Sequence, residues 1–323
     1  MSAAGGIAAA THIPVLAQRI LEILAPALSE PGSIYVDGTL GLGGHARLVL
    51  AACPNAQLIG IDRDPNALAI AAERLADFGD RVQLFQAIYH ELPEVLDEAG
   101  VPSVQAMLLD LGLSSLQIDA TARGFAYATD APLDMRMTPT QELSAATIIN
   151  TWSESDLARI LREFGEERFA GRIAAAIVAA RATREFRTSG ELVPVIADAI
   201  PAAARHTGGH PAKRTFQALR IVVNDELGSL GGVLPAALAA LAPSGRLAVL
   251  AYHSGEDRLV KRAFAKVTTD RVPVGVPEVP AEYRAKFQLL TRGAERPSPT
   301  ETAANPRAAS ARLRAVIRNP EVN

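Results

Sequence analysis

Three aspartates that end apolar runs are the side chains best suited to chemistry in this sequence. Asp37 ends the run that begins at Ser33, and Asp62 and Asp110 end two similar runs further along the chain. Such runs are typical of buried parallel strands, whose carboxyl ends meet at one edge of a sheet. Because α/β proteins bind their ligands at that edge, the pattern predicts a ligand site with three carboxylates.

A glycine-rich loop follows the first aspartate. Residues Gly41–Gly44 let the backbone approach a ligand closely and present amides at the start of a helix. Asp62 follows about 20 residues later, the separation at which an acidic side chain accepts hydrogen bonds from ribose hydroxyls. The combination predicts an adenosine-containing cofactor. Residues Gly41–Ala46 also satisfy the degenerate dinucleotide fingerprint, so at this point a nicotinamide oxidoreductase stays open, as does a tight turn with aspartates that only cap helices.

Alternating strand and helix patterns carry these residues. The predicted strands are 33–37, 57–62, 81–87 and 104–110, and a proline-capped helix is expected over 67–78. Near-continuous apolar strands that alternate with helices indicate an α/β fold with a mostly parallel, doubly wound sheet.

The pattern changes after Gln117, because the stretch from Asp119 to Arg205 is mainly helical and shows no convincing strand. We therefore expect an inserted all-helical domain over 118–205, and a discontinuous domain made of 1–117 and 206–323. The second half of that domain is predicted to hold two helices over 215–227 and 231–241, a strand over 245–252, an irregular arm over 268–305 and a final edge strand over 311–318.

Composition limits the class of protein. The chain has 323 residues, 49% of them hydrophobic, and a net charge of -3, which together predict a globular protein. One cysteine, Cys53, excludes a disulfide framework or a thiolate cluster and fits a reducing compartment. With no signal peptide or long apolar run, we expect a cytoplasmic protein with no membrane partner. No set of His, Asp and Glu residues has the spacing of a structural metal site, so no metal is expected.

Several longer blocks resemble one family, the RsmH (MraW) small-subunit ribosomal RNA methyltransferases. The resemblance extends from His12 to Arg318 and rests on unusual motifs. The matching blocks are Tyr35–His45, Ile61–Pro65, Leu108–Gln117, Arg123–Phe125, Pro132–Met137, Phe164–Phe169, His210–Arg220 and Tyr252–Arg258.

The resemblance implies a Rossmann-like class I methyltransferase fold with S-adenosylmethionine as cofactor and S-adenosylhomocysteine as product. The implied reaction is methylation of the exocyclic N4 nitrogen of a cytosine in the decoding centre (P site) of 16S rRNA, nucleotide 1402 in the family's convention. By position, the family's cofactor contacts fall on Gly43, Gly44, His45, Asp62, Tyr89, Asp110 and Gln117, to which the loop pattern adds Asp37 and Gly41. Tyr89 stands where the family often has phenylalanine and still offers a flat face for adenine.

A cytosine amino group is a poor nucleophile, because its lone pair is delocalised into the ring. Acceptors must bind its hydrogens, localise the lone pair and remove a proton. Asp110, with Ser114 and Ser115 on the following loop, is the polar set best placed for this role. Asp110 could instead use both oxygens on the cofactor and on loop amides.

The block after the strand at 245–252 has two interpretations. His253, Ser254, Glu256 and Asp257 could lie at the functional edge, or Ser254 could cap the next helix with Asp257 three residues on. His45 and His210 are expected to be hydrogen-bonding loop residues more than bases. Trp152 and Phe164 are expected in the core of the helical insert.

RNA contact requires local basic patches, because the net charge gives no overall attraction. The candidates lie in motifs that flank the insert, and the alternative for each is an ordinary salt bridge: Arg123, Arg136, Lys213, Arg214 and Arg220. The target base is expected to be flipped out of its helix.

The leading hypothesis is an enzyme that methylates 16S rRNA within the small ribosomal subunit, as a monomer or a homodimer. A methyltransferase on another nucleic acid and a non-catalytic subunit assembly factor are the alternatives. The assembly factor predicts binding without turnover.

Overall fold

A computed structural model describes residues 14–113, 123–138, 140–205, 209–270, 280 and 283–320. The chain divides into two compact units. The first unit comprises residues 1–112 and 230–323, and the second comprises residues 113–229. The predicted insert, 118–205, lies within the second unit. Predicted Ser114, Ser115 and Gln117 lie outside the described residues.

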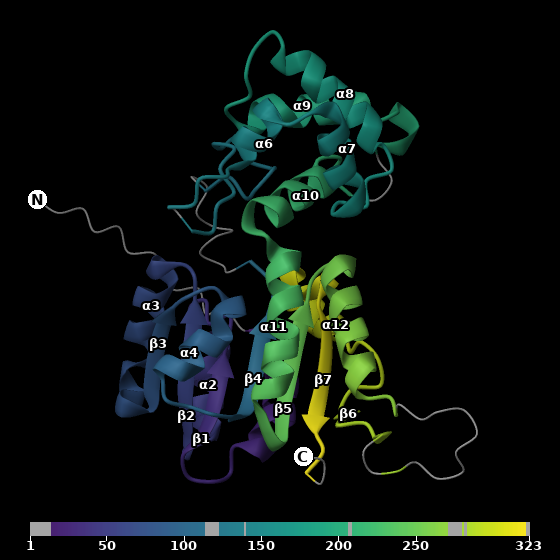
Figure 1. The fold of residues 1–323 in the computed structure, drawn as a ribbon. Helices are drawn as coiled ribbons and strands as arrows, with labels where there is room; N and C mark the ends of the chain where they lie inside the picture. The colour runs from purple at the N-terminus through teal and green to yellow at the C-terminus, as the bar shows by residue number, and fades with distance from the viewer. Residues whose placement is uncertain are drawn as a thin grey trace, which may run out of the picture. The chain divides into compact units, whose positions relative to one another are not determined.

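The first unit is built on a seven-stranded sheet in the order β3-β2-β1-β4-β5-β7-β6 (Figure 1). Strands β1 to β5 run parallel, and β7 is antiparallel to both of its neighbours. This is the expected mostly parallel α/β sheet, and the fold-class prediction is confirmed. The strands are β1 (Ser33–Asp37), β2 (Ala56–Asp62), β3 (Val82–Gln86), β4 (Val104–Asp110), β5 (Leu241–Ala251), β6 (Phe287–Leu289) and β7 (Arg312–Arg318).

Helices cover both faces of the sheet, because alternate strand residues point to opposite sides. On β1, Tyr35 belongs to the same apolar cluster as residues of α1, α2 and α3, whereas Val36 belongs to a cluster with residues of α4, α11 and α12. Both faces are therefore apolar, as in other doubly wound sheets. The helices are α1 (Ala17–Leu24), α2 (Gly44–Ala52), α3 (Pro65–Leu75), α4 (Leu92–Glu98), α11 (Glu226–Ala240) and α12 (Ser254–Val267), with 3-10 turns η1 (Ala25–Ala27), η2 (Ala76–Arg81) and η3 (Tyr89–Glu91).

Strand β5 begins before the turn that was expected to precede it. Val104 of β4 pairs with Leu241, but Ala106 pairs with Arg246, so the register jumps across the segment 242–245. Ser244 in that segment has a φ of 62°. The local proline and glycine therefore mark a bulge within the strand, where the sequence pattern predicted its beginning.

The strand predicted at 311–318 is present, but the prediction that it forms the edge of the sheet is wrong. It corresponds to β7, which pairs with β5 on one side and β6 on the other. The edge is β6, a three-residue strand from the arm that was expected to be irregular, and the same arm holds α13 (Pro299–Ala304) and η7 (Pro306–Ser310). A strand of three residues is too short to show the alternation on which sequence patterns depend.

The second unit is helical around its own apolar core, with no β-strand among its described residues. Trp152 and Phe164 pack against that core, as predicted. Helix α10 also belongs here, because Phe216, Leu219 and Val223 pack into the same core. The elements are α6 (Ala145–Thr151), α7 (Glu154–Glu163), α8 (Ala170–Arg181), α9 (Ser189–Ala199), η5 (Ala202–Ala204) and α10 (Lys213–Asn224). Within the described ranges, no single helix is long and apolar enough to cross a bilayer; only the bent pair of α10 and α11 would pass that test, by length and composition.

Candidate active site

The site lies where the strand order of the sheet reverses. Strand β1 has β2 on one side and β4 on the other, and the connections after β1 and β4 leave in opposite directions. Asp37 and Asp110 end these two strands, and Asp62 ends β2. In open α/β sheets the crevice at this point receives the ligand.

The loop after β1 is tied to both neighbouring strands. The Gly38 amide donates to the Leu108 carbonyl at 3.0 Å, and the Leu40 amide donates to the Ile61 carbonyl at 2.9 Å. Gly43 then takes a φ of 75°, a left-handed conformation that glycine adopts without a steric penalty, and α2 begins at the next residue. No side chain of the described residues caps α2, so its first amides are available to an acceptor from a ligand.

Asp62 braces this loop. One carboxylate oxygen accepts from the Gly41 amide at 2.7 Å, and the other accepts from the Asp64 amide at 2.9 Å. Burial raises the pKa of Asp62, and these two amide hydrogen bonds oppose the rise. Each oxygen of an ionised carboxylate has two acceptor positions, so Asp62 retains capacity for the hydroxyls of a ligand.

Asp37 is a deeply buried carboxyl group. It is 1% exposed, its Oδ2 lies 3.2 Å from the Tyr35 hydroxyl, and its Oδ1 accepts from the Thr39 amide at 3.2 Å. Burial raises its pKa to about 6, against the attraction of His45 and the amide hydrogen bond. Asp37 is therefore a group whose charge depends on its surroundings near neutral pH.

The two carboxylate oxygens of Asp110 have different surroundings among the described residues. Its Oδ2 lies 3.5 Å from His45 Nε2, close enough for charge attraction but without hydrogen-bond geometry. The Tyr252 side chain lies near Asp110, and burial, together with the charge of Asp110, raises the pKa of Tyr252 well above its usual value. The buried Oδ1 has no hydrogen-bond partner among the described residues. An orphaned acceptor of this kind is costly unless a ligand satisfies it.

Tyr252 is a site residue that sequence reasoning did not single out for a role. It follows β5, and its ring occupies the space where a side chain on Gly112 would stand, because a Cβ there would meet the ring at 2.8 Å. Its amide donates to Glu256 Oε2 at 2.7 Å. The Tyr252–Arg258 block was the only feature of the sequence that pointed to this residue. The residues around Tyr252 in the sequence do not show that its ring reaches the end of β4.

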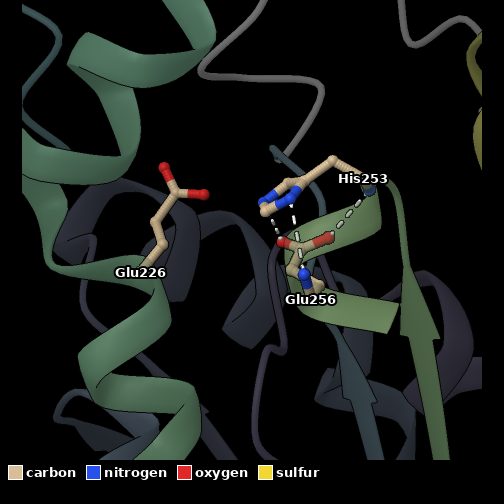
Figure 2. Close-up of side chains that lie close together, drawn as sticks. All are labelled: Glu226, His253 and Glu256. Carbon is tan, nitrogen blue, oxygen red and sulfur yellow. Dashed lines mark hydrogen bonds and ion pairs between the residues drawn. The ribbon is translucent and has the colours of Figure 1, made fainter. Parts of the chain in front are cut away.

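The turn after Tyr252 caps α12. The His253 and Glu256 side chains face each other at the start of this helix in Figure 2, where Nδ1 of His253 accepts from the Glu256 amide and Glu256 Oε2 accepts from the His253 amide. The expected cap at Ser254 with Asp257 is thus wrong by one residue. Asp257 instead pairs with Arg314 at 2.7 Å and with Arg312 at 3.2 Å, partners that lie far away in sequence.

The candidate RNA-binding cations of the second unit differ in whether an acidic side chain binds them. Arg136 forms a two-pronged pair with Asp134 at 2.7 and 2.9 Å, and Arg220 forms one with Glu226 at 2.8 Å for both contacts. Glu226 is the third residue drawn in Figure 2. These two arginines are held in place by acidic partners, which is the salt-bridge alternative stated above.

The remaining three candidates differ in their exposure. Lys213 and Arg214 are exposed in the first turn of α10, and Arg123 is half-buried near Asp134, whose pKa its charge helps to lower. Arg214 donates to the Glu166 carbonyl at 3.3 Å.

Comparison with known proteins shows the family of this chain. The MraW methylase family matches residues 9–319. The protein named ribosomal RNA small subunit methyltransferase H from Thermobifida fusca is 56% identical over 98% of this chain and 96% of its own length. The protein of the same name from Acidothermus cellulolyticus is 58% identical over 95% of this chain and 93% of its own.

The chain belongs to the MraW methylase family. Its cofactor is S-adenosylmethionine. A solved rRNA methylase from Streptococcus thermophilus is 13% identical with a TM-score of 0.41 over 93% of each chain, a likeness too weak to add to the family assignment. The nicotinamide oxidoreductase suggested by the glycine loop alone is thereby set aside.

The residues of this MraW methylase fit the cofactor. Asp62 offers acceptor positions for two ribose hydroxyls, and the start of α2, which no side chain of the described residues caps, suits a carboxylate. Tyr89 is half-buried in η3, and its Cβ lies 3.7 Å from where a Cβ on Gly38 would stand. The predicted residues of β1, β2, β4 and their loops therefore meet at one edge of the sheet.

Proposed function

We propose that this MraW methylase methylates the exocyclic N4 amino group of a cytosine in the decoding centre of 16S rRNA, nucleotide 1402 in the family's convention. The substrate is the assembled or nearly assembled small ribosomal subunit in the cytoplasm. The relatives that cover 95% of this chain or more at 56–58% identity carry the proposal, because their name states action on small-subunit rRNA.

The geometry of Asp110 supports transfer to a weak nitrogen nucleophile. When bound, S-adenosylmethionine supplies a methyl group on a positively charged sulfur. The task left to the protein is to hold the target nitrogen in line with that methyl and to manage its proton. His45 Nε2 lies 3.5 Å from one oxygen of Asp110, and the other oxygen, which has no hydrogen-bond partner among the described residues, is proposed to accept a hydrogen of the amino group.

Acceptance of that hydrogen would localise the nitrogen lone pair, and Asp110 would take the proton that the nitrogen loses when it receives the methyl group. Ser114 and Ser115 follow directly in the sequence and are proposed to hold the base. The candidate cations of the second unit are proposed to contact the RNA backbone, and Lys213 and Arg214 are the exposed ones among them.

The test is transfer of a labelled methyl group from S-adenosylmethionine to small subunits prepared from cells that lack the gene. Nuclease digestion and mass analysis then locate the modified nucleoside. We expect one N4-methylated cytosine in the decoding centre. Label in another nucleotide or another RNA would refute the proposed substrate, and tight cofactor binding without incorporation would favour the assembly factor.

The variant Asp110→Ala separates catalysis from binding. We expect at least a hundredfold loss of kcat, with subunit binding retained, because the variant lacks the acceptor for the amino proton. The exposed Asp77, whose side chain is 80% accessible, provides a matched Asp→Ala control that should retain full activity. Methylation by Asp110→Ala at the wild-type rate would move the proton acceptor to another residue.

A further inference from the structure

Three rings in the second unit lead from its core to its surface. Phe216 of α10 is 3% exposed and belongs to the core. Tyr127 meets it edge-on at 5.9 Å between ring centroids, and the His210 imidazole stacks on Tyr127 at 4.5 Å with an interplanar angle of 25°. His210 is the exposed end of this array.

The His210 ring is also fixed in orientation. Its Nδ1 accepts from the Ala212 amide at 3.2 Å, and its carbonyl accepts from the Lys213 amide at 3.0 Å. An acceptor at Nδ1 places the proton of the neutral ring on Nε2. The loop before α10 thus holds the imidazole against Tyr127, so a ligand that stacks on it has little side-chain entropy to remove.

Two positively charged residues follow His210 closely in the sequence. Lys213 and Arg214 lie three and four residues after His210, and both are exposed. Within the described part of the chain, neither is in an ion pair, in contrast to Arg136 and Arg220, which bind acidic partners. An exposed flat ring beside such cations is the combination with which proteins bind single-stranded nucleic acid, since the ring stacks on a base and the cations meet phosphates.

We propose that His210 is a stacking platform for an unpaired base of the RNA substrate, and that Lys213 and Arg214 hold the adjacent phosphates. This inference rests on the proposed action on RNA and adds a contact in the second unit to it. The alternative is a purely structural histidine that orders the start of α10.

Variants at His210 separate the two roles. His210→Ala removes the ring, and His210→Phe keeps a ring that can stack but cannot accept the Ala212 amide. Loss of one stacked base weakens RNA binding by about fivefold to a hundredfold. We therefore expect His210→Ala to raise the Kd for small subunits, and the KM in methyl transfer, by that factor at unchanged kcat, and His210→Phe to restore both.

Salt dependence distinguishes stacking from charge. We would measure the Kd for small subunits and for protein-free 16S rRNA at several KCl concentrations. His210→Ala should weaken binding equally at every concentration, whereas Lys213→Ala and Arg214→Ala should each reduce the slope of log K against log salt by about one. A His210→Ala defect on subunits but not on protein-free rRNA would assign the ring to a ribosomal protein and overturn the proposal.

The structural alternative makes the opposite prediction. If His210 only orders the loop, His210→Phe should fail like His210→Ala, because neither variant accepts the Ala212 amide. Trp152 is the only tryptophan and packs against the core of the second unit, so its fluorescence reports whether that unit remains folded in each variant. A wild-type enzyme that binds no small subunits would refute the proposed function; wild-type affinity in His210→Ala would refute only this inference.

Discussion

Two carboxyl groups and one imidazole lie close together in the active site. Asp37 and Asp110 end adjacent strands, and His45 attracts both of them. Burial raises the pKa of Asp37, and the nearby charge of Asp110 raises it further. Two like charges in one buried site disfavour each other, so the protein loses some stability to keep this arrangement ready for a ligand.

We expect the contribution of Asp37 to the free energy of unfolding to depend on pH. Because its pKa is about 6 in the folded protein, against an ordinary value of 3.8, the folded state binds the proton more tightly than the unfolded chain does. The contribution to the free energy of unfolding is therefore largest below about pH 4 and is lost as the pH rises through about 6. The variant Asp37→Asn carries no charge to lose. We expect its free energy of unfolding, relative to wild type, to increase by up to about 3 kcal/mol between pH 4 and pH 7.

Urea unfolding at pH steps from 4 to 8 measures this difference, and Asp77→Ala serves as a control on an exposed carboxylate. A difference between Asp37→Asn and wild type that stays constant with pH would show that Asp37 has an ordinary pKa in the folded protein.

Asp62→Ala is expected to weaken cofactor binding. The substitution removes the acceptor for ribose hydroxyls and leaves the Gly41 and Asp64 amides without their partner. Lost hydrogen bonds to a charged group cost about 1.5–3 kcal/mol, or about tenfold to a hundredfold in Kd. Titration calorimetry with S-adenosylmethionine measures the change, and an affinity within twofold of wild type would remove Asp62 from the cofactor site.

Among the elements and their connections, the loop between β1 and α2 is the one expected to meet the cofactor. Gly43 takes a left-handed φ of 75° at the start of α2, and Gly32, which precedes β1, takes a φ of 77° in open space. The two positions require the same backbone conformation, but only Gly43 belongs to the loop that is expected to meet the cofactor. They form a matched pair for separating backbone strain from function.

Alanine at either glycine should destabilise the fold by about 1–2 kcal/mol, because the left-handed conformation is unfavourable for residues with a Cβ. Only Gly43→Ala should also weaken cofactor binding, since its Cβ would lie 3.3 Å from Leu75 and shift the loop. Thermal unfolding and calorimetry on both variants test this. Equal cofactor affinities in Gly32→Ala and Gly43→Ala would show that the loop backbone tolerates the shift.

At the scale of the whole molecule, the second unit is one continuous segment with its own core. Residues 113–229 enclose a cluster of buried side chains that includes Ile148, Ile160 and Ile173. Segments of this size that enclose a core commonly fold alone. We expect the 113–229 fragment to unfold cooperatively when followed by Trp152 fluorescence and far-UV circular dichroism. A fragment that shows no cooperative transition would mean that its core needs the remainder of the chain.

The sequence by itself determined the sheet and the position of its acidic edge. Parallel strands buried on both faces must be continuous apolar runs, and their carboxyl ends lie at one edge whatever the details of packing. Asp37, Asp62 and Asp110 could therefore be placed together from the printed residues. The family motifs added the cofactor, because a long block such as Leu108–Gln117 is specific where a single glycine loop is not.

Only the tertiary structure decided which side chains contact partners far away in the sequence. Tyr252 reaches Asp110 across more than a hundred residues of sequence, Asp257 binds Arg312 and Arg314, and β6 takes the edge outside β7. Such pairings depend on which elements approach each other in space, and no local periodicity records that approach. For the same reason, sequence pattern could not separate Arg136 and Arg220, which are bound to acids, from the exposed Lys213 and Arg214 beside the stacked ring of His210.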